Sequence, residues 1–333
     1  MSGAAPDRMG RRFTALMACL LLSSAGNGLC FPFTAIYISE LLGLGPGIAG
    51  GYFVAMAAAS FAAALLGGPL ADRRGPHRVG VLGAAALAAG YALLAPAGST
   101  VPVLLSGGCV GVGFGLFYAS IVGVVDEAVP ESRRRTAFTL RHVVNNVGIG
   151  AGSVIAGLAL HGADTPTGAL RWLYVANAAA ALPLLVVTWA VRPRTGPAGK
   201  PAGADGAGPG YRTLLRSRPM ALLICAQALF AIVGFTQIEA TVPLLMHDRM
   251  AVTLGWVSVV TAVNSFALVV LQPLGRRWFE RLPETVCLAV GPVLWAVAFG
   301  CGLLAAALDG SGGPALRYAL LICFAVVFAA RAN

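Results

Sequence analysis

Apolar residues are gathered into ten long runs that alternate with short polar segments. The runs hold about 20 residues or more, the length that a helix needs to cross ~30 Å of hydrocarbon at 1.5 Å per residue. The predicted spans are Phe13–Tyr37, Gly47–Pro69, Val79–Ala97, Val101–Val125, Thr136–Leu160, Leu170–Val191, Met220–Met246, Ala251–Pro273, Val286–Ala307 and one that begins near Leu316. This pattern predicts an all-α, polytopic membrane protein with about ten transmembrane helices.

Composition excludes several other classes of protein. Hydrophobic residues make up 58% of the chain and charged residues 11%, against about 45–50% and 25% in soluble domains. The net charge of +10 does not indicate nucleic acid, because the arginines lie in loops between apolar runs. The seven cysteines lie inside apolar runs and form no Cys/His cluster, so we expect neither metal nor disulfides. Phosphate-binding loops and nucleophile elbows are missing from the sequence, and we expect no enzyme activity and no cofactor.

The basic residues predict the orientation of the helices. Nineteen of the 23 Lys and Arg residues lie in segments on one side of the predicted membrane, and three lie on the other side. Because basic loops remain in the cytoplasm, we expect a cytoplasmic N-terminus in the inner or plasma membrane of the cell.

A Gly/Pro/Ala-rich segment, residues 192–218, predicts a flexible cytoplasmic linker. It separates a six-helix bundle, residues 1–191, from residues 219–333, where four further helices begin. Pro69-Leu70-Ala71-Asp72-Arg73 has a counterpart in Pro273-Leu274-Gly275-Arg276-Arg277, so the halves read as a parallel repeat. A second copy as long as the first would bring the chain to roughly 400 residues. We therefore expect an incomplete second bundle, about ten of twelve helices, in a C-terminally truncated chain.

The segment between the second and third predicted helices carries a specific motif. It reads Gly68-Pro69-Leu70-Ala71-Asp72-Arg73-Arg74-Gly75-Pro76-His77-Arg78. It resembles the signature loop of the major facilitator superfamily, G-x-x-x-D-R/K-x-G-R/K-R/K, and departs from it at Pro76 and His77. The resemblance implies two six-helix bundles and a cytoplasmic gate of breakable ion pairs that includes Gly68, Asp72, Arg73, Gly75 and Arg78. An ordinary positive-inside loop is the alternative interpretation.

The fourth and fifth predicted helices extend this resemblance. Their polar positions, Asp126, Arg133, Arg141, Asn145 and Asn146, are spaced as in efflux-type members of the superfamily. Ser153 stands where those members have a proline, so the strict antiporter motif is not present. The resemblance adds Asp126 and Arg133 to the gate.

Polar side chains at membrane depth predict a substrate cavity. Hydrocarbon cannot satisfy them, so they face other helices or a water-filled space. The candidate cavity residues are Asn27, Tyr118, Arg141, Asn145, Asn146, Gln237 and Asn264. Any single Asn or Gln could instead form an interhelical hydrogen bond. Taken together, the set predicts a central and mostly uncharged cavity.

Glu239 is the only carboxylate well inside an apolar run. An ionised carboxylate is costly at that depth, so we expect Glu239 to take up and release a proton near neutral pH. A solvated position at the outer mouth, or a pair with Arg249, is the alternative.

The predicted function is secondary active transport by alternating access. We favour proton-coupled efflux of a hydrophobic or amphipathic small molecule by a monomer, with the lipid bilayer, the substrate and protons as partners. Uptake of a sugar or another neutral metabolite is the alternative within the same class. From a different class, the chain could be a non-transporting membrane receptor or scaffold, or a non-functional fragment.

Overall fold

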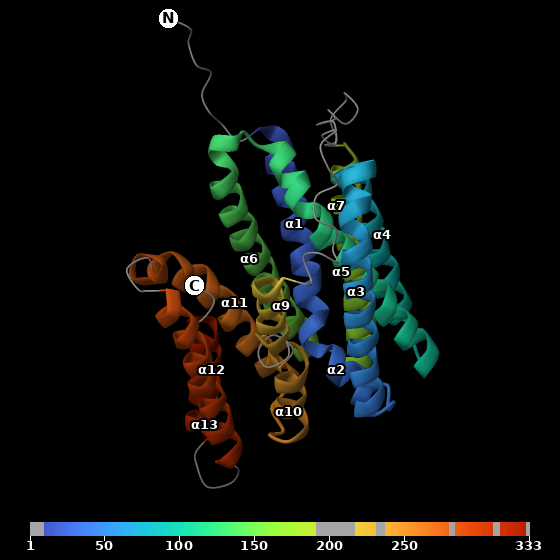
Figure 1. Ribbon diagram of the computed structural model, residues 1–333. Helices are drawn as coiled ribbons and strands as arrows, with labels where there is room; N and C mark the ends of the chain where they lie inside the picture. Colours follow the sequence, from blue (N-terminus) through green and yellow to red (C-terminus); the bar gives the residue numbers. More distant parts are fainter. Residues whose placement is uncertain (1–9, 191–216, 231–236, 280–283, 309–313, 331–333) are drawn as a thin grey trace, which may run out of the picture.

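The computed structural model describes residues 10–190, 217–230, 237–279, 284–308 and 314–330, and all its regular elements there are helical (Figure 1). The N-terminal half comprises α1 (Arg11–Cys30), η1 (Phe31–Phe33), α2 (Thr34–Ile36), η2 (Tyr37–Leu41), α3 (Pro46–Arg74), α4 (Pro76–Leu94), α5 (Thr100–Ala128), η3 (Glu131–Arg133), α6 (Arg134–His161) and α7 (Pro166–Ala190). The C-terminal half comprises α9 (Arg218–Phe230), η5 (Gln237–Thr241), α10 (Val242–Asp248), α11 (Leu254–Phe279), α12 (Glu284–Ala307) and α13 (Pro314–Ala330). The predicted linker falls almost entirely on residues outside these described ranges.

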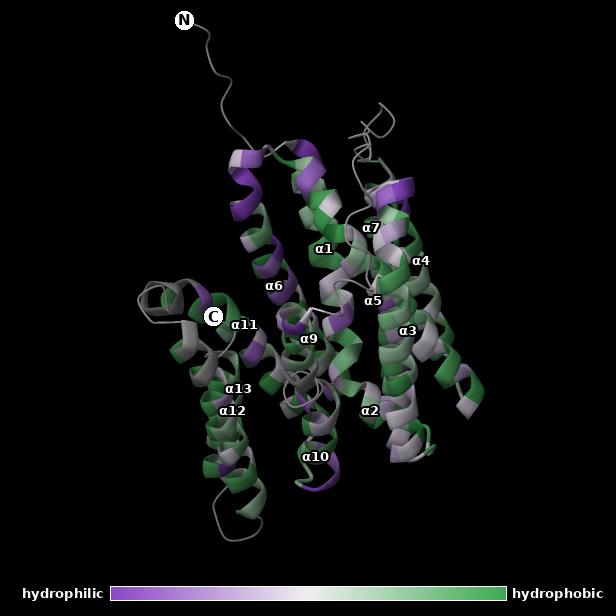
Figure 2. Cartoon of the chain, viewed as in Figure 1, coloured by the Kyte–Doolittle hydropathy of each residue, from purple (hydrophilic) through white to green (hydrophobic). Residues whose placement is uncertain are grey.

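The outside of the helices is apolar, as a bilayer requires. Trp172 is 75% exposed and Leu66 is 72% exposed, positions that water would penalise and hydrocarbon does not. Figure 2 shows green along the middle of the helices and purple at one end of α1, α3 and α6. Within the described ranges, eight helices are long and apolar enough to cross a membrane. The prediction of an all-helical, multi-pass membrane protein is confirmed.

Two predicted helix ends lie too early in the chain. The second helix was expected to stop at Pro69 and the eighth at Pro273, but α3 continues to Arg74 and α11 to Phe279. Proline removes one backbone donor without forbidding the turns that follow it. The motif between α3 and α4 is therefore helical except at Gly75, whose φ of 87° is the left-handed conformation that glycine adopts without strain.

The first and seventh predicted helices are both interrupted near the same end of the molecule. In the first, Pro32 lies in the short 3₁₀ segment η1, and the π-helix η2 follows. In the seventh, α9 is followed by the π-helix η5 and by α10. Single π-helical turns inside membrane helices are frequent at functional sites.

The two halves meet along α6 and α11, and again where α10 lies against α2. Within the N-terminal half, α6 packs closely on α1, because a Cβ at Gly152 would overlap the carbonyl oxygen of Ala25. Gly148 lies against α1 in the same way, as its four-residue spacing from Gly152 predicts. Since α1, α6 and α11 form one contiguous layer, polar residues on their facing sides converge at the centre of the molecule.

Candidate functional site

A cavity of about 300 Å³ lies between the two halves. Residues of α1, η1, α4, α5, α6 and α7 line it from the N-terminal half, and residues of α10, α11 and α13 line it from the C-terminal half. Its polar lining is made of Ser23, Ser24, Asn27, Tyr118, Asn145, Asn146, Thr261, Asn264 and Ser265. Both halves therefore contribute side chains to one shared cavity, which is the arrangement that alternating access needs.

Five of the seven predicted cavity residues lie around this space: Asn27, Tyr118, Asn145, Asn146 and Asn264. Arg141 and Gln237 are partly buried but are not among the lining residues that the structure describes. Glu239 belongs to η5, and its side chain lies outside what the structure describes. Sequence reasoning overlooked the apolar residues of the lining, among them Phe114 and Phe328, because nothing in a local pattern distinguishes them from core residues.

The amides of Asn146 and Asn264 are oriented by their own hydrogen bonds. Asn146 donates from Nδ2 to the carbonyl oxygen of His142 at 2.9 Å, and Asn264 donates from Nδ2 to that of Ala325 at 3.0 Å. A backbone carbonyl only accepts, so the nitrogen of each amide must face it. In both residues Oδ1 is left without a partner among the described residues, and each half thus offers a hydrogen-bond acceptor at the cavity.

Asn27 and Asn145 have a second role in holding helices together. Tyr91 of α4 donates to Oδ1 of Asn27 at 3.0 Å, and Ser24 of α1 donates to Oδ1 of Asn145 at 2.9 Å. These are the interhelical hydrogen bonds that sequence analysis left as an alternative. The two amides therefore line the cavity and also connect α1 to its neighbours.

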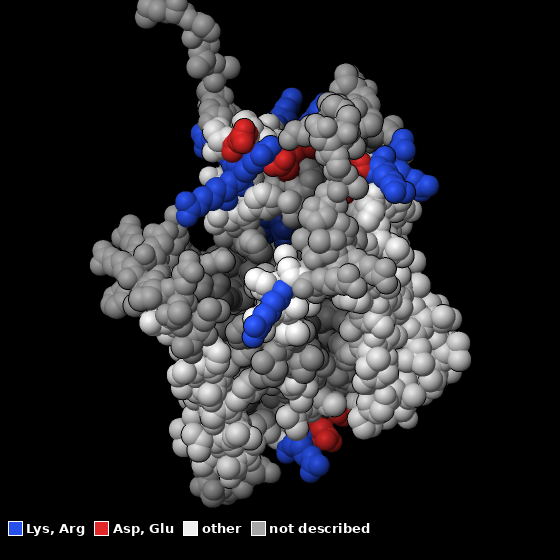
Figure 3. Space-filling view, viewed as in Figure 1, with Lys and Arg blue, Asp and Glu red and all other residues white. Residues whose placement is uncertain are grey.

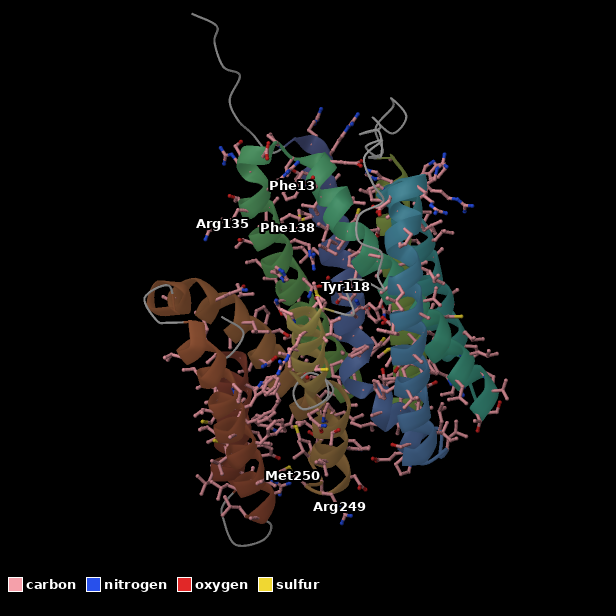
Figure 4. All side chains as sticks on the ribbon, viewed as in Figure 1. Phe13, Tyr118, Arg135, Phe138, Arg249 and Met250 are labelled. Carbon is pink, nitrogen blue, oxygen red and sulfur yellow. The ribbon has the colours of Figure 1, made fainter. Side chains whose placement is uncertain are left out.

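One wall of the cavity is aromatic. The rings of Phe31 and Phe114 meet edge to face with centroids 6.2 Å apart, and Tyr118 stacks on Phe114 at 6.2 Å. Figure 4 places Tyr118 near mid-height, between the end with Phe13 and the end with Arg249. Tyr118 is more than half exposed, so this aromatic wall is accessible to an entering molecule. Stacked and edge-on rings of this kind accept a further aromatic ring favourably.

Charged side chains are absent from the described lining of the cavity, although Arg141 interacts electrostatically with the lining residue Tyr118. None of the described residues that line it is Asp, Glu, Lys, Arg or His. Most visible Lys and Arg side chains gather at one end of the molecule, which we call the arginine-rich end. A smaller group of charges lies at the opposite end, which we call the Glu40 end, and a further blue side chain lies near mid-height (Figure 3). The described lining offers no counter-ion, so it suits an uncharged ligand.

The predicted gate residues lie at the arginine-rich end. Asp126 forms an ion pair with Nε of Arg134, a residue outside the predicted gate set. Arg134 also lies 3.7 Å from the carboxylate of Glu131. Asp72, Arg73 and Arg78 are exposed, and Asp72 makes no ion pair with a residue that the structure describes. Gly68 is of intermediate exposure, whereas at the preceding Gly67 an added Cβ would lie 2.9 Å from that of Ala119. Gly75 has a positive φ.

His77 is a contact residue that sequence analysis treated only as a departure from the motif. It is 5% exposed. Its Nδ1 lies 3.0 Å from the carbonyl oxygen of Thr188 in α7, and its Nε2 lies 2.9 Å from the carboxylate of Glu127 in α5. His77 therefore joins three helices at the arginine-rich end. The one sequence signal of this role was that His77 stands where the family motif has Arg or Lys.

Comparison with known families identifies the family to which this chain belongs. The sequence profile of the Major Facilitator Superfamily matches residues 16–332, and the chain belongs to this superfamily of transporters. The uncharacterized MFS-type transporter YttB of Bacillus subtilis (strain 168) is 24% identical over 305 residues, a match that covers 89% of this chain and 73% of YttB. The family resemblance inferred from the motif is confirmed.

Solved structures share the fold at low sequence identity. Tetrameric PepTSo2 is similar with a TM-score of 0.70 and 18% identity, covering 95% of this chain and 82% of that chain. The nucleoside transporter NupG is similar with a TM-score of 0.70 and 15% identity, covering 97% and 79%. At such identities the likeness concerns the fold and not the substrate.

Proposed function

We propose that the protein exports an uncharged, amphipathic small molecule by alternating access, driven by protons. The observation that carries this proposal is the cavity between the halves, which is lined from both sides and whose described lining has no charged side chain. A ligand held there contacts both halves at once, so its binding can bias their relative movement. The membership of the superfamily supports transport as the class of function.

The lining suggests the chemistry of the substrate. The aromatic wall of Phe31, Phe114 and Tyr118 favours a ligand with a planar ring. The free oxygens of Asn146 and Asn264 favour groups that donate hydrogen bonds, such as an N–H or O–H. A volume of about 300 Å³ limits the ligand to the size of a small metabolite or drug.

Proton coupling and orientation are the further parts of the proposal. Glu239, in the π-helix η5, is the candidate proton site, because a carboxylate at membrane depth is stable only if it is paired or protonated. The arginine-rich end faces the cytoplasm of the cell and the Glu40 end faces outside, as the excess of basic residues supports. Asp126 with Arg134, and the neighbouring Asp72, Arg73 and Arg78, close the cytoplasmic end by ion pairs that form in one state and break in the other.

The test is transport in proteoliposomes with an imposed proton gradient. The probe is N-phenyl-1-naphthylamine, a neutral aromatic amine with one N–H donor, followed by its fluorescence. We expect gradient-driven movement that stops when nigericin collapses the gradient, and that the Glu239→Gln variant binds the probe without moving it uphill. If the wild type moved the probe equally well without a proton gradient, proton coupling would be excluded. Unchanged transport by Glu239→Gln would exclude Glu239 as the proton site.

Uptake of a neutral polar metabolite is a second candidate, favoured by the amide groups at the cavity. Asn27, Asn146 and Asn264 could hold the hydroxyl groups of a sugar or nucleoside. Vesicles loaded with labelled uridine or glucose, compared with vesicles that receive the label from outside, separate import from export. Gradient-driven inward movement of such a compound would favour this candidate over export of an aromatic amphipathic molecule.

A further inference from the structure

Two cysteine thiols meet between α12 and α13. Sγ of Cys301 donates a hydrogen bond to Sγ of Cys323, and the two sulfur atoms are 3.8 Å apart. Both cysteines are free. Neither side chain belongs to the described lining of the cavity, so the proposed transport makes no use of this pair, which we call the α12–α13 dithiol.

The α12–α13 dithiol lies at membrane depth and faces the bilayer. Cys323 is exposed and Cys301 is partly exposed. One turn before and one turn after Cys301, Val297 and Leu304 are 50% and 58% exposed, a surface suited to hydrocarbon and not to water. Measured from the helix ends nearest their connection, Cys301 is about 9 Å into α12 and Cys323 is about 14 Å into α13. Small molecules that dissolve in the bilayer therefore reach both thiols.

Charged residues lie far from these thiols along both helices. On the described part of α13 the charged residue is Arg317, about 9 Å of helix before Cys323. Glu284 lies at the opposite end of α12 from Cys301. An adduct that carried a net charge would be costly in such surroundings. A stable adduct of the two thiols is therefore neutral.

The distance between the sulfur atoms is that of two ligands on one central atom. Two sulfurs bonded to one atom at about 2.3 Å, the length of a zinc–thiolate bond, and at the tetrahedral angle lie roughly 3.8 Å apart. A disulfide bond would need them at about 2.05 Å, and its formation would consume an oxidant. The two helices thus present the thiols at a spacing that a bridging atom fills with little movement.

Charge and ligand number select the bridging atom. Zinc needs three or four protein ligands, and the residues that the structure describes hold no group of three or more His, Cys, Asp or Glu side chains fit for a metal ion. Copper(I) between two thiolates leaves a net negative charge, and mercury(II) prefers its two sulfurs on opposite sides, further apart than these. Trivalent arsenic with one organic group forms two further bonds, so two thiols complete it as a neutral adduct.

We infer that Cys301 and Cys323 form a covalent binding site for neutral trivalent organoarsenicals, which enter it from the bilayer. An arsonous acid, R–As(OH)₂, reacts with both thiols. Two As–S bonds form, two As–O bonds break, and each thiol hydrogen leaves with one hydroxyl group as water. Arsenic remains trivalent and no electron is transferred. The product joins α12 to α13 through one arsenic atom.

The site is tested with phenylarsine oxide, which hydrates to phenylarsonous acid, on the purified full chain in lipid vesicles. Excess 2-mercaptoethanol, a monothiol, then removes arsenic that one sulfur holds, whereas the dithiol 2,3-dimercaptopropanol also removes arsenic that two sulfurs hold. We expect phenylarsenic that resists the monothiol and yields to the dithiol. Trypsin cuts after Arg317, between the two cysteines, so mass spectrometry should find the two peptides joined by the phenylarsenic group.

Variants assign the binding to this pair. Cys301→Ala and Cys323→Ala each leave a single thiol, and loss of the second, intramolecular bond should raise the half-saturating concentration about 10²- to 10⁴-fold. The matched control is Cys225→Ala, which removes an exposed cysteine of α9. This control should bind phenylarsine oxide as the wild type does.

The inference would be overturned by a wild type without monothiol-resistant phenylarsenic, by an unchanged half-saturating concentration in both Cys301→Ala and Cys323→Ala, or by a disulfide between these cysteines in the untreated protein. An equal rise in Cys225→Ala would also overturn it. The joined peptides are read from the wild type, so a variant that fails to fold leaves the test intact. The readout needs neither substrate nor gradient, and failed transport with intact arsenical binding would contradict the proposed function alone.

Discussion

The imidazole Nε2 of His77 lies 2.9 Å from the carboxylate of Glu127, and its Nδ1 lies 3.0 Å from the carbonyl oxygen of Thr188. Both ring nitrogens thus face oxygen atoms that accept hydrogen bonds. Through these two nitrogens the side chain of His77 contacts both α5 and α7. It ties the start of α4 to α5 and α7, at the end where the family motif would place a basic residue.

Removal of this imidazole should destabilise the N-terminal half. In the His77→Ala variant the buried carbonyl of Thr188 and the carboxylate of Glu127 lose a partner, which costs about 1–3 kcal/mol. Thermal unfolding in detergent should show a lower midpoint than the wild type. His161→Ala, at an exposed site, should leave the midpoint unchanged. Equal midpoints for the two variants would contradict a structural role for His77.

A methyl group added at Gly152 should push α6 away from α1. A Cβ there overlaps the carbonyl oxygen of Ala25, and overpacking of this kind costs about 1–3 kcal/mol. Gly108 in α5 has open space at the same position, so Gly108→Ala should be neutral or stabilise its helix by up to about 1 kcal/mol. The Gly152→Ala variant is therefore expected to lower thermal stability, and the Gly108→Ala variant to leave it unchanged or raise it. A shift of the same sign in both would mean that the close approach of α1 and α6 is not rigid.

Loss of the amide at Asn264 should weaken ligand binding. Asn264→Leu removes the acceptor that α11 offers to the cavity, and one net hydrogen bond of about 0.5–1.5 kcal/mol corresponds to roughly two- to tenfold in Kd. Quenching of intrinsic fluorescence by N-phenyl-1-naphthylamine measures the affinity. Val270→Leu, an exposed position on the same helix, serves as the control and should bind as the wild type does. An unaltered Kd in Asn264→Leu would remove this residue from the site.

The ion pair of Asp126 and Arg134 should contribute little to the free energy of unfolding in any one conformational state. Both side chains are more than a third exposed, and such pairs are worth about 0.2–1 kcal/mol. A double-mutant cycle of Asp126→Asn and Arg134→Gln, measured by unfolding, should give a coupling in this range that diminishes in 1 M salt. A coupling well above this range would mean that the pair becomes buried in the membrane-embedded protein. The same cycle with Arg133 in place of Arg134 tests whether this other predicted gate residue also couples to Asp126.

Parts of this site could be read from the sequence. Asn27, Asn145 and Asn264 could be assigned to the interior because an amide at membrane depth has no partner in hydrocarbon. Their roles could not be separated, because a hydrogen bond such as that from Tyr91 to Asn27 depends on how α4 crosses α1. The ion pair of Asp126 with Arg134 could not be read from the sequence for a similar reason, since it depends on how the end of α5 lies against the start of α6.

The sequence by itself determined the membrane class, the approximate positions of the helices along the chain and the side on which basic residues gather. Each of these depends on the free energy of transferring single residues from water to hydrocarbon. That free energy does not depend on distant parts of the chain. Only the tertiary structure decided that Phe31 and Phe114 form a cavity wall, that His77 meets Glu127, and that Cys301 meets Cys323. Contacts of this kind depend on the rotation and crossing of helices that are distant in the chain, and ridge-and-groove packing, not hydropathy, sets them.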